Sequence, residues 1–193
     1  MSKESFAKQI IAKLQSAVGT DGSLYSESTP TSAQTAIAEA ISEYLIANTI
    51  VTISYTGTLT NGSPDPIVAD TMQVIGSCAS TGTPANFTAW VTALQSSIAA
   101  SITVQSPGTN GIVTTFQPFS SVAGALTINQ LALKSAFEAN TQAPLQSVWE
   151  ALCGGLLTWF NSDAAKNPSA VAIAATRTGA SSGTASLVSI TVS

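Results

Sequence analysis

The stretch AIAEAISEYLIANTIVTISYTGTL, residues Ala36–Leu59, changes from a helical to an extended pattern near its middle, and this change decides the fold class. In its first half, apolar side chains recur every three or four residues, which predicts a helix from about Thr31 to Asn48. From Thr49 to Thr58 the residues are dense in β-branched side chains, which favours a strand. We therefore expect an α+β protein in which this helix leads directly into a strand.

The residues that follow predict a partner for this strand. The loop NGSPDP, Asn61–Pro66, is rich in turn-forming residues. Beyond it, Ile67–Ala79 contains the apolar residues of a second strand. An antiparallel pair closed by the loop is the simplest arrangement.

Four further segments have a helical pattern, which brings the expected number of helices to about five. They are Lys3–Val18, a helix with Pro84 in its first turn, a helix that opens at Thr127, and Leu145–Phe160. The last is apolar around much of its surface, so we expect it in the centre of the fold or at a subunit contact. On the helix at 31–48, Glu39 and Glu43 have no lysine beside them, so we expect no ion pair there.

The antiparallel sheet is expected to be small, with short strands at 101–105 and 112–116 and a C-terminal β-hairpin. Ala170–Val192 contains two apolar runs around Gly179–Gly183, which predicts the hairpin. Apart from Arg177 the hairpin carries no charge, whereas edge strands are normally protected by charge or proline. We therefore expect a neighbouring chain to cover this edge.

The length of 193 residues fits a single structural domain, 1–193. Within it, residues 1–30 are expected to form a protruding N-terminal helix and a connector, with Lys3, Lys8 and Lys13 on a solvated helix face. The N-terminal residues have no continuous apolar stretch, so we expect no signal peptide there. The apolar stretch 143–160 is interrupted by Glu150 and is expected to be a core helix and not a membrane span.

Charge is scarce along the whole chain. Only 8% of the residues are charged and there is no histidine, whereas an ordinary domain has about 25% charged residues. No positive charge occurs between Lys13 and Lys134, and the net charge is −4. Nucleic-acid binding needs clustered lysine and arginine, so we expect no nucleic-acid partner, and we expect no anionic membrane as partner. Catalytic systems that need histidine are excluded, as are the glycine-rich phosphate motifs, and no cofactor is expected.

Two carboxylates are the best candidates for chemistry. Asp65 and Asp70 flank one loop and could share a calcium ion or act as an acid and base pair. The alternative, which we prefer, is a solvated turn aspartate and a strand-end aspartate.

Glu150 lies between apolar residues, where burial would raise its pKa, but an exposed glutamate on a helix explains it more simply. Cys78 and Cys153 lie in apolar contexts and are expected to be small buried side chains, although a disulfide between them stays open. We therefore expect no catalytic, cofactor-binding or metal site, and no enzyme.

The run Ala36–Leu59, the SPDP loop at Ser63–Pro66 and the helix start Gly82-Thr83-Pro84 resemble segments of small structural proteins from tailed-bacteriophage virions. The Ser/Thr/Gly-rich C-terminal strands add to this resemblance. It implies a virion component without enzymatic activity, made in the host cytoplasm and assembled in many copies in the tail, baseplate or neck. Its partners would be copies of itself and other virion proteins.

Side chains of serine and threonine lose less conformational entropy on burial than lysine or glutamate, and interface cores are depleted in charge. The composition therefore favours lateral contacts between copies. The expected contact elements are the first helix, the helix at 145–160 and the C-terminal strands. Two alternatives remain, a head decoration or capsid-associated protein and a secreted carbohydrate-binding module. The second needs exposed aromatic residues on a sheet, whereas Trp90, Trp149 and Trp159 fall on expected helices with core-like spacing.

Overall fold

The structure is a computed structural model that describes residues 2–18, 30–78, 87–105, 110–120, 146–178 and 181–193. The described helices are α1 (Lys3–Val18), α2 (Pro30–Asn48), α3 (Phe87–Ser101) and α5 (Gln146–Phe160). The strands are β1 (Thr49–Leu59), β2 (Pro64–Gly76), β3 (Ile102–Gln105), β4 (Ile112–Val113), β5 (Thr115–Phe116), β6 (Ile173–Arg177) and β7 (Ser181–Val192). Two 3₁₀ turns, η1 (Asp163–Ala165) and η2 (Pro168–Ala170), precede β6. The α+β class is confirmed, and the helix expected to open at Thr127 lies outside the described residues.

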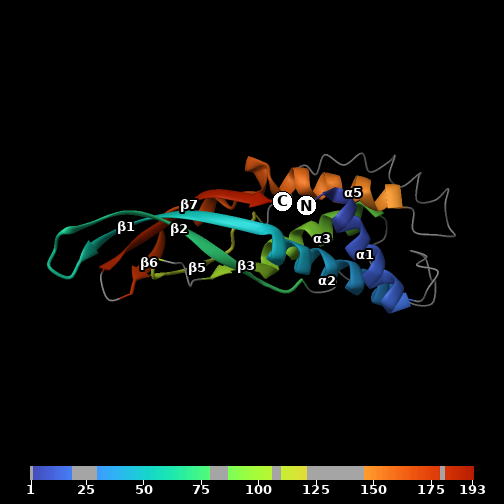
Figure 1. The fold of residues 1–193 in the computed structure, drawn as a ribbon, viewed down its shortest axis with the longest axis horizontal. Coiled ribbons are helices and arrows are strands. Elements are labelled where there is room, and N and C mark those ends of the chain that lie inside the picture. Colours follow the sequence, from blue (N-terminus) through green and yellow to red (C-terminus); the bar gives the residue numbers. More distant parts are fainter. Residues whose placement is uncertain (1, 19–29, 79–86, 106–109, 121–145, 179–180) are drawn as a thin grey trace.

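The sheet is larger than expected, because all seven strands join one antiparallel sheet in the order β4-β6-β7-β1-β2-β3-β5. As expected, α2 leads directly into β1 at Asn48, and β1 and β2 form an antiparallel pair. The turn between them is tighter than the expected loop, since Pro64 and Pro66 already belong to β2. The long strands extend away from the helices, so the molecule is elongated, with the helices gathered at one end (Figure 1).

The C-terminal hairpin is confirmed, but it does not form a free edge. Strand β7 lies between β6 and β1, where it pairs along its length with β1 from Thr49↔Val192 to Leu59↔Ser181. At its C-terminal end, β6 is paired in turn with β4 through Thr176 and Arg177. A hairpin with little charge is therefore compatible with the fold, since strands inside a sheet need no protection by charge.

Residues 110–120, which we call the closing segment, connect the two edges of the sheet. Its strands β4 and β5 are separated only by Thr114, yet they occupy opposite ends of the strand order. On one side Asn110 donates a side-chain hydrogen bond to Ala69 O (2.9 Å), and β5 pairs with β3. On the other side β4 pairs with β6, and Thr114 Oγ1 donates to Ala174 O (3.1 Å). One short segment thus bends the sheet into a nearly closed barrel.

Helix α1 packs in the core and does not protrude. Phe6, Ile10 and Leu14 on its apolar face are fully buried. The Phe6 ring stacks on that of Tyr44 in α2, with 3.9 Å between the ring centroids. The connector expected before residue 30 lies almost wholly outside the described residues.

The expectation that Glu39 and Glu43 form no ion pair is wrong, because a lysine from another helix reaches them. Lys13 Nζ of α1 lies 2.7 Å from Glu43 Oε1 and 3.4 Å from Glu39 Oε2. The hydrogen bond to Glu43 is the main cause that raises the pKa of Lys13. The ion pairs form between helices, which spacing within a single helix does not show.

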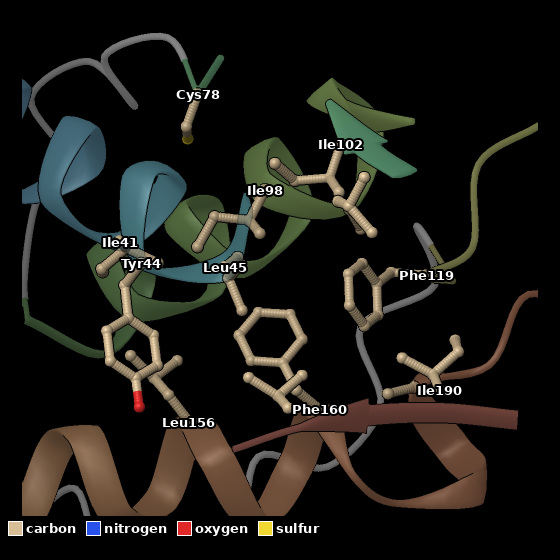
Figure 2. Close-up of a cluster of buried hydrophobic side chains, with 14 of the residues drawn as sticks. Ile41, Tyr44, Leu45, Cys78, Ile98, Ile102, Phe119, Leu156, Phe160 and Ile190 are labelled. Carbon is tan, nitrogen blue, oxygen red and sulfur yellow. The ribbon is translucent and has the colours of Figure 1, made fainter. Parts of the chain in front are cut away.

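The main core lies where the four helices meet the ends of the long strands. Figure 2 shows the Phe160 ring of α5 directed at Leu45 of α2, with Phe119 and Ile190 beside it. Phe119 and Phe160 make an edge contact, with ring centroids 4.8 Å apart. Helix α5 packs one face into this core, since Trp149, Leu156 and Phe160 are almost completely buried, whereas Ser147, Ala151 and Thr158 on its other face are exposed. The part of the sheet that points away from the helices, which we call its far part, lies outside this main core (Figure 1).

Candidate functional site: a hydroxyl-covered sheet face

The outward side of the long strands is covered by short neutral side chains. Alternation along β1 sends Val51, Ile53 and Tyr55 inward, where all three are fully buried. The residues between them point outward. The register extends this outward side over four neighbouring strands.

We give the name hydroxyl face to fifteen residues of this outward side, beside which Pro64, the partner of Thr58, and the exposed Ile67 lie on β2. Its members are Ile50, Thr52, Ser54, Thr56 and Thr58 of β1, Ala69, Thr71 and Gln73 of β2, Ala174 and Thr176 of β6, and Ser182, Thr184, Ser186, Ser189 and Thr191 of β7. Eleven of them carry a hydroxyl group, and none is charged.

The register aligns these hydroxyl groups in rows across the strands. One row runs from Thr176 of β6 through Ser182 of β7 to Thr58 of β1. Another runs from Ser189 through Thr52 to Thr71 of β2. Neighbouring strands lie about 4.8 Å apart, so the face is a regular array of groups that each donate and accept a hydrogen bond.

Within the described protein these hydroxyl groups are almost all without a hydrogen-bond partner. The exception is Ser186, whose Oγ accepts a hydrogen bond from Ala172 N (3.4 Å). The other ten are half-exposed or exposed. They are therefore available to water or to another molecule.

The charged groups of the same strands point to the inner side. Asp65 of β2 is buried, and its Oδ1 accepts a hydrogen bond from Arg177 Nη1 of β6 at 2.9 Å. Its Oδ2 accepts a short hydrogen bond from Ser181 Oγ of β7. Because the ionised carboxylate only accepts, Ser181 donates to it and in turn accepts from Tyr55 Oη of β1 (2.8 Å). This network connects four strands and keeps charge away from the hydroxyl face.

Two glycines make room for this network, one for the Tyr55 ring and one for the backbone of β1. Gly57 of β1 and Gly183 of β7 are directly paired. A β-carbon on Gly57 would lie 2.7 Å from Tyr55 Cζ, which is closer than real side chains approach. A β-carbon on Gly183 would collide with the backbone of β1 at Thr56 and Gly57. The strands can therefore close over the network only because both positions lack a side chain.

The structure does not bring Asp65 and Asp70 together. Both point inward and are buried within β2, so the expectation of a solvated turn aspartate and a strand-end aspartate is wrong. They lie five residues apart along β2, or about 15 Å at the usual rise of a strand, which is too far to share an ion or a proton. Asp70 Oδ1 accepts a hydrogen bond from Thr71 N (2.8 Å), and its Oδ2 accepts one from Asn110 N (3.4 Å). Among the described residues, no three His, Cys, Asp or Glu side chains are grouped to hold a metal ion.

Glu150 lies on α5 and is half-buried, where its Oε1 accepts a hydrogen bond from Gln146 Nε2 (2.8 Å).

The two cysteines are buried and unbridged, which answers the open question of a disulfide. Burial raises the pKa of Cys78 to about 11. Burial, and secondly the charge of Glu150, raise the pKa of Cys153 as well. Both thiols are therefore protonated at neutral pH and poor nucleophiles.

The tryptophans of α5 are packed in the core. Trp149 and Trp159 are only 1% and 3% exposed, so neither offers a ring to a ligand at the surface. The side chain of Trp90 lies outside the described part of the structure. No described helix is long and apolar enough to span a membrane.

The chain matches no protein-family model, no curated protein and no solved structure.

Sequence reasoning missed the hydroxyl face and the pair of Asp65 with Arg177. The alternation of Thr and Ser with apolar residues from Thr49 to Thr58 was the available signal for the face. The pair joins residues 112 positions apart, and only the pairing of β7 with both β1 and β6 brings them together.

Proposed function

We propose that the protein is a non-enzymatic structural component of a tailed-bacteriophage particle, assembled in multiple copies in its tail, baseplate or neck. The observation that carries the proposal is the hydroxyl face, a surface of fifteen residues without a charge that extends beyond the helical core. Interface cores are depleted in charge, and short side chains lose little entropy when they are covered. Such a surface suits repeated contact with neighbouring subunits.

The use of the charged side chains also supports this proposal. Asp65 and Arg177 hold strands together, while Lys13 connects α1 with α2 through Glu39 and Glu43. These groups stabilise the fold from inside or between its helices. Asp65, one of the two acid and base candidates from the sequence, is thereby committed to a structural contact.

The face of the sheet gives less support to a carbohydrate-binding module. Stacking on sugars needs exposed aromatic rings, but Tyr55 of the sheet is fully buried on its inner side. The five large apolar side chains that are exposed in the described residues are all isoleucine or valine, namely Ile50, Ile67, Val113, Val171 and Val188. Thus the described sheet presents hydroxyl groups and not rings.

The test is to purify phage particles from cells that carry the gene and to quantify this protein in them by mass spectrometry. We expect several copies per particle, and we expect them to remain with tails after heads and tails are separated. Copies found with heads would favour a head decoration protein. Absence from particles that contain the other virion proteins would reject the proposal.

A further inference from the structure

We propose that the hydroxyl face is the contact surface for a second copy of this chain, with the same face of both copies packed against each other. This inference rests on the proposed function, because it names the partner and the surface through which copies assemble. It concerns the fifteen residues already defined and no other part of the molecule.

Hydrogen-bonding chemistry favours a copy of the chain as the partner. A hydroxyl group donates and accepts, so an array of hydroxyl groups is complementary to an identical array. In a two-fold contact each surface meets itself, which a surface with a net charge would oppose by repulsion. The ten hydroxyl groups that lack a partner within the described protein can find one across such a contact.

The size of the face meets the requirement for a specific contact. Strand β1 has 11 residues, which corresponds to a length of about 36 Å. Strands β7, β1 and β2 with the short β6 give an area of about 600 Å² at the usual strand spacing. Contact over the whole face of both copies would therefore bury up to about 1,200 Å² in total, which is at the lower end of the range for stable specific interfaces.

The shape of the side chains also fits this contact. Threonine and serine are short, and threonine has few rotamers, so little conformational entropy is lost when two such faces meet. Two sheets that pack face to face align their strands at about 30°. Ile50, which is 54% exposed at one end of the face, would be covered in the same contact.

The edge next to the face is less suited to strand addition. The part of β2 that has no strand on its outer side begins with Pro64 and Pro66. Proline lacks the N–H group that a new strand would need, so prolines protect an edge against pairing. We therefore assign the contact to the face and not to the edge.

The test measures self-association of the full chain by sedimentation velocity. In the first variant, T52K/T56K, two lysines stand in the middle of the face, and in the second, T52E/T56E, two glutamates replace the same residues. We expect each variant alone to raise the dissociation constant of self-association at least tenfold. An equimolar mixture of the two should associate at least as tightly as the wild type, because opposite charges then meet across the contact.

A matched control places the same charge elsewhere. Ala100 of α3 and Ala151 of α5 are exposed, so A100K/A151K adds two lysines to the helical end. We expect its dissociation constant to stay within about twofold of the wild type. The wild-type constant should also change little between about 0.05 and 0.5 M salt, since the face holds no charge to screen. Circular dichroism and urea unfolding establish that each variant is folded.

Three results would overturn this inference: a wild type that stays monomeric at high concentration, charged variants that associate like the wild type, or a mixture that fails to restore association. If the protein is nevertheless found in purified particles, the structural function stands and only this surface is rejected. Absence from the particles would reject the proposed function, whatever the self-association shows.

Discussion

The Tyr55 side chain lies over Gly57, two residues further along β1, and its Oη atom lies 2.8 Å from Ser181 Oγ on the neighbouring strand β7. The ring occupies the space that a side chain at position 57 would fill. This arrangement places an aromatic ring above a glycine and connects its hydroxyl group, through Ser181, to the buried Asp65. The stability of the far part of the sheet therefore depends on a position that has no side chain.

Replacement of Gly57 by alanine should destabilise the protein by about 1–3 kcal/mol, since the new methyl group overlaps the Tyr55 ring. Urea unfolding at low protein concentration measures the free energy. The exposed neighbour Thr56 provides the control, because Thr56→Ala should change the free energy of unfolding by less than about 0.5 kcal/mol. In a Tyr55→Ala background the Gly57→Ala change should cost less. Equal costs in both backgrounds would contradict the overlap.

Replacement of Asp65 by asparagine should destabilise the protein by about 2–4 kcal/mol, because it leaves the Arg177 guanidinium without its charged partner. The Arg177 side chain is about one-third exposed, so we expect a value towards the lower part of that range. Asp163 pairs with Lys166 on the surface, and Asp163→Asn should have no measurable effect on unfolding. Similar losses for the two substitutions would show that burial of the Asp65 pair is unimportant.

Stability should fall as the pH rises above 9. The pKa of Cys78 is about 11 in the folded protein, raised from the ordinary value of 9.0. Above pH 9 the thiol ionises in the unfolded chain but stays protonated in the folded one. The folded state is therefore fully stable, in this respect, below the unfolded pKa and loses stability as the pH rises through the folded pKa. Tyr44, with its pKa raised by burial, acts in the same direction above pH 10. Urea titrations at pH 8, 9, 10 and 11 measure the decline.

Cys78→Ala provides the check on this pH dependence. The variant should lose less stability than the wild type between pH 9 and 11, since it has one buried thiol fewer to ionise on unfolding, Cys153 being the one that remains. The same slope for both proteins would mean that Cys78 does not contribute.

Replacement of Thr114 by valine should loosen the barrel closure at β6. The change keeps the shape but removes the hydrogen bond to Ala174 O, at a cost of about 1 kcal/mol. Hydrogen exchange should become faster in β6, while β1, in the middle of the sheet, keeps its protection. Thr115, the next residue, is exposed, so Thr115→Val is the matched control. Faster exchange of β1 and β6 alike would indicate global destabilisation, which would contradict a local closure.

The local elements followed from the sequence because local patterns determine them. The apolar spacing gave α1 its bounds at Lys3 and Val18, and the change of pattern near Asn48 placed the junction of α2 and β1. Turn residues at 61–66 predicted the hairpin of β1 and β2, and those at 179–183 predicted that of β6 and β7. These features depend on neighbours in the chain.

The sheet order and the charge network could not be predicted in this way. The insertion of the C-terminal hairpin beside β1 depends on contacts between distant strands, and periodicity contains no information about them. Asp65 was expected to be solvated because it belongs to the turn-forming stretch 61–66, whereas Arg177 and Ser181 from the other hairpin bury it. For the same reason Lys13 could not be assigned to Glu43 before the packing of α1 on α2 was known.

The pairing of β1 with β7 also has a consequence for how the protein reaches its fold. Tyr55 and Ser181 are 126 residues apart in sequence, and the closing segment between them needs both halves of the sheet. Contacts between such distant residues form slowly, since a long loop must close before they stabilise anything. On the ribosome, β1 can pair with β2 early but must wait for β7. We therefore expect nascent chains that lack β7 to expose one edge of β1, and to depend on chaperones until β7 is made.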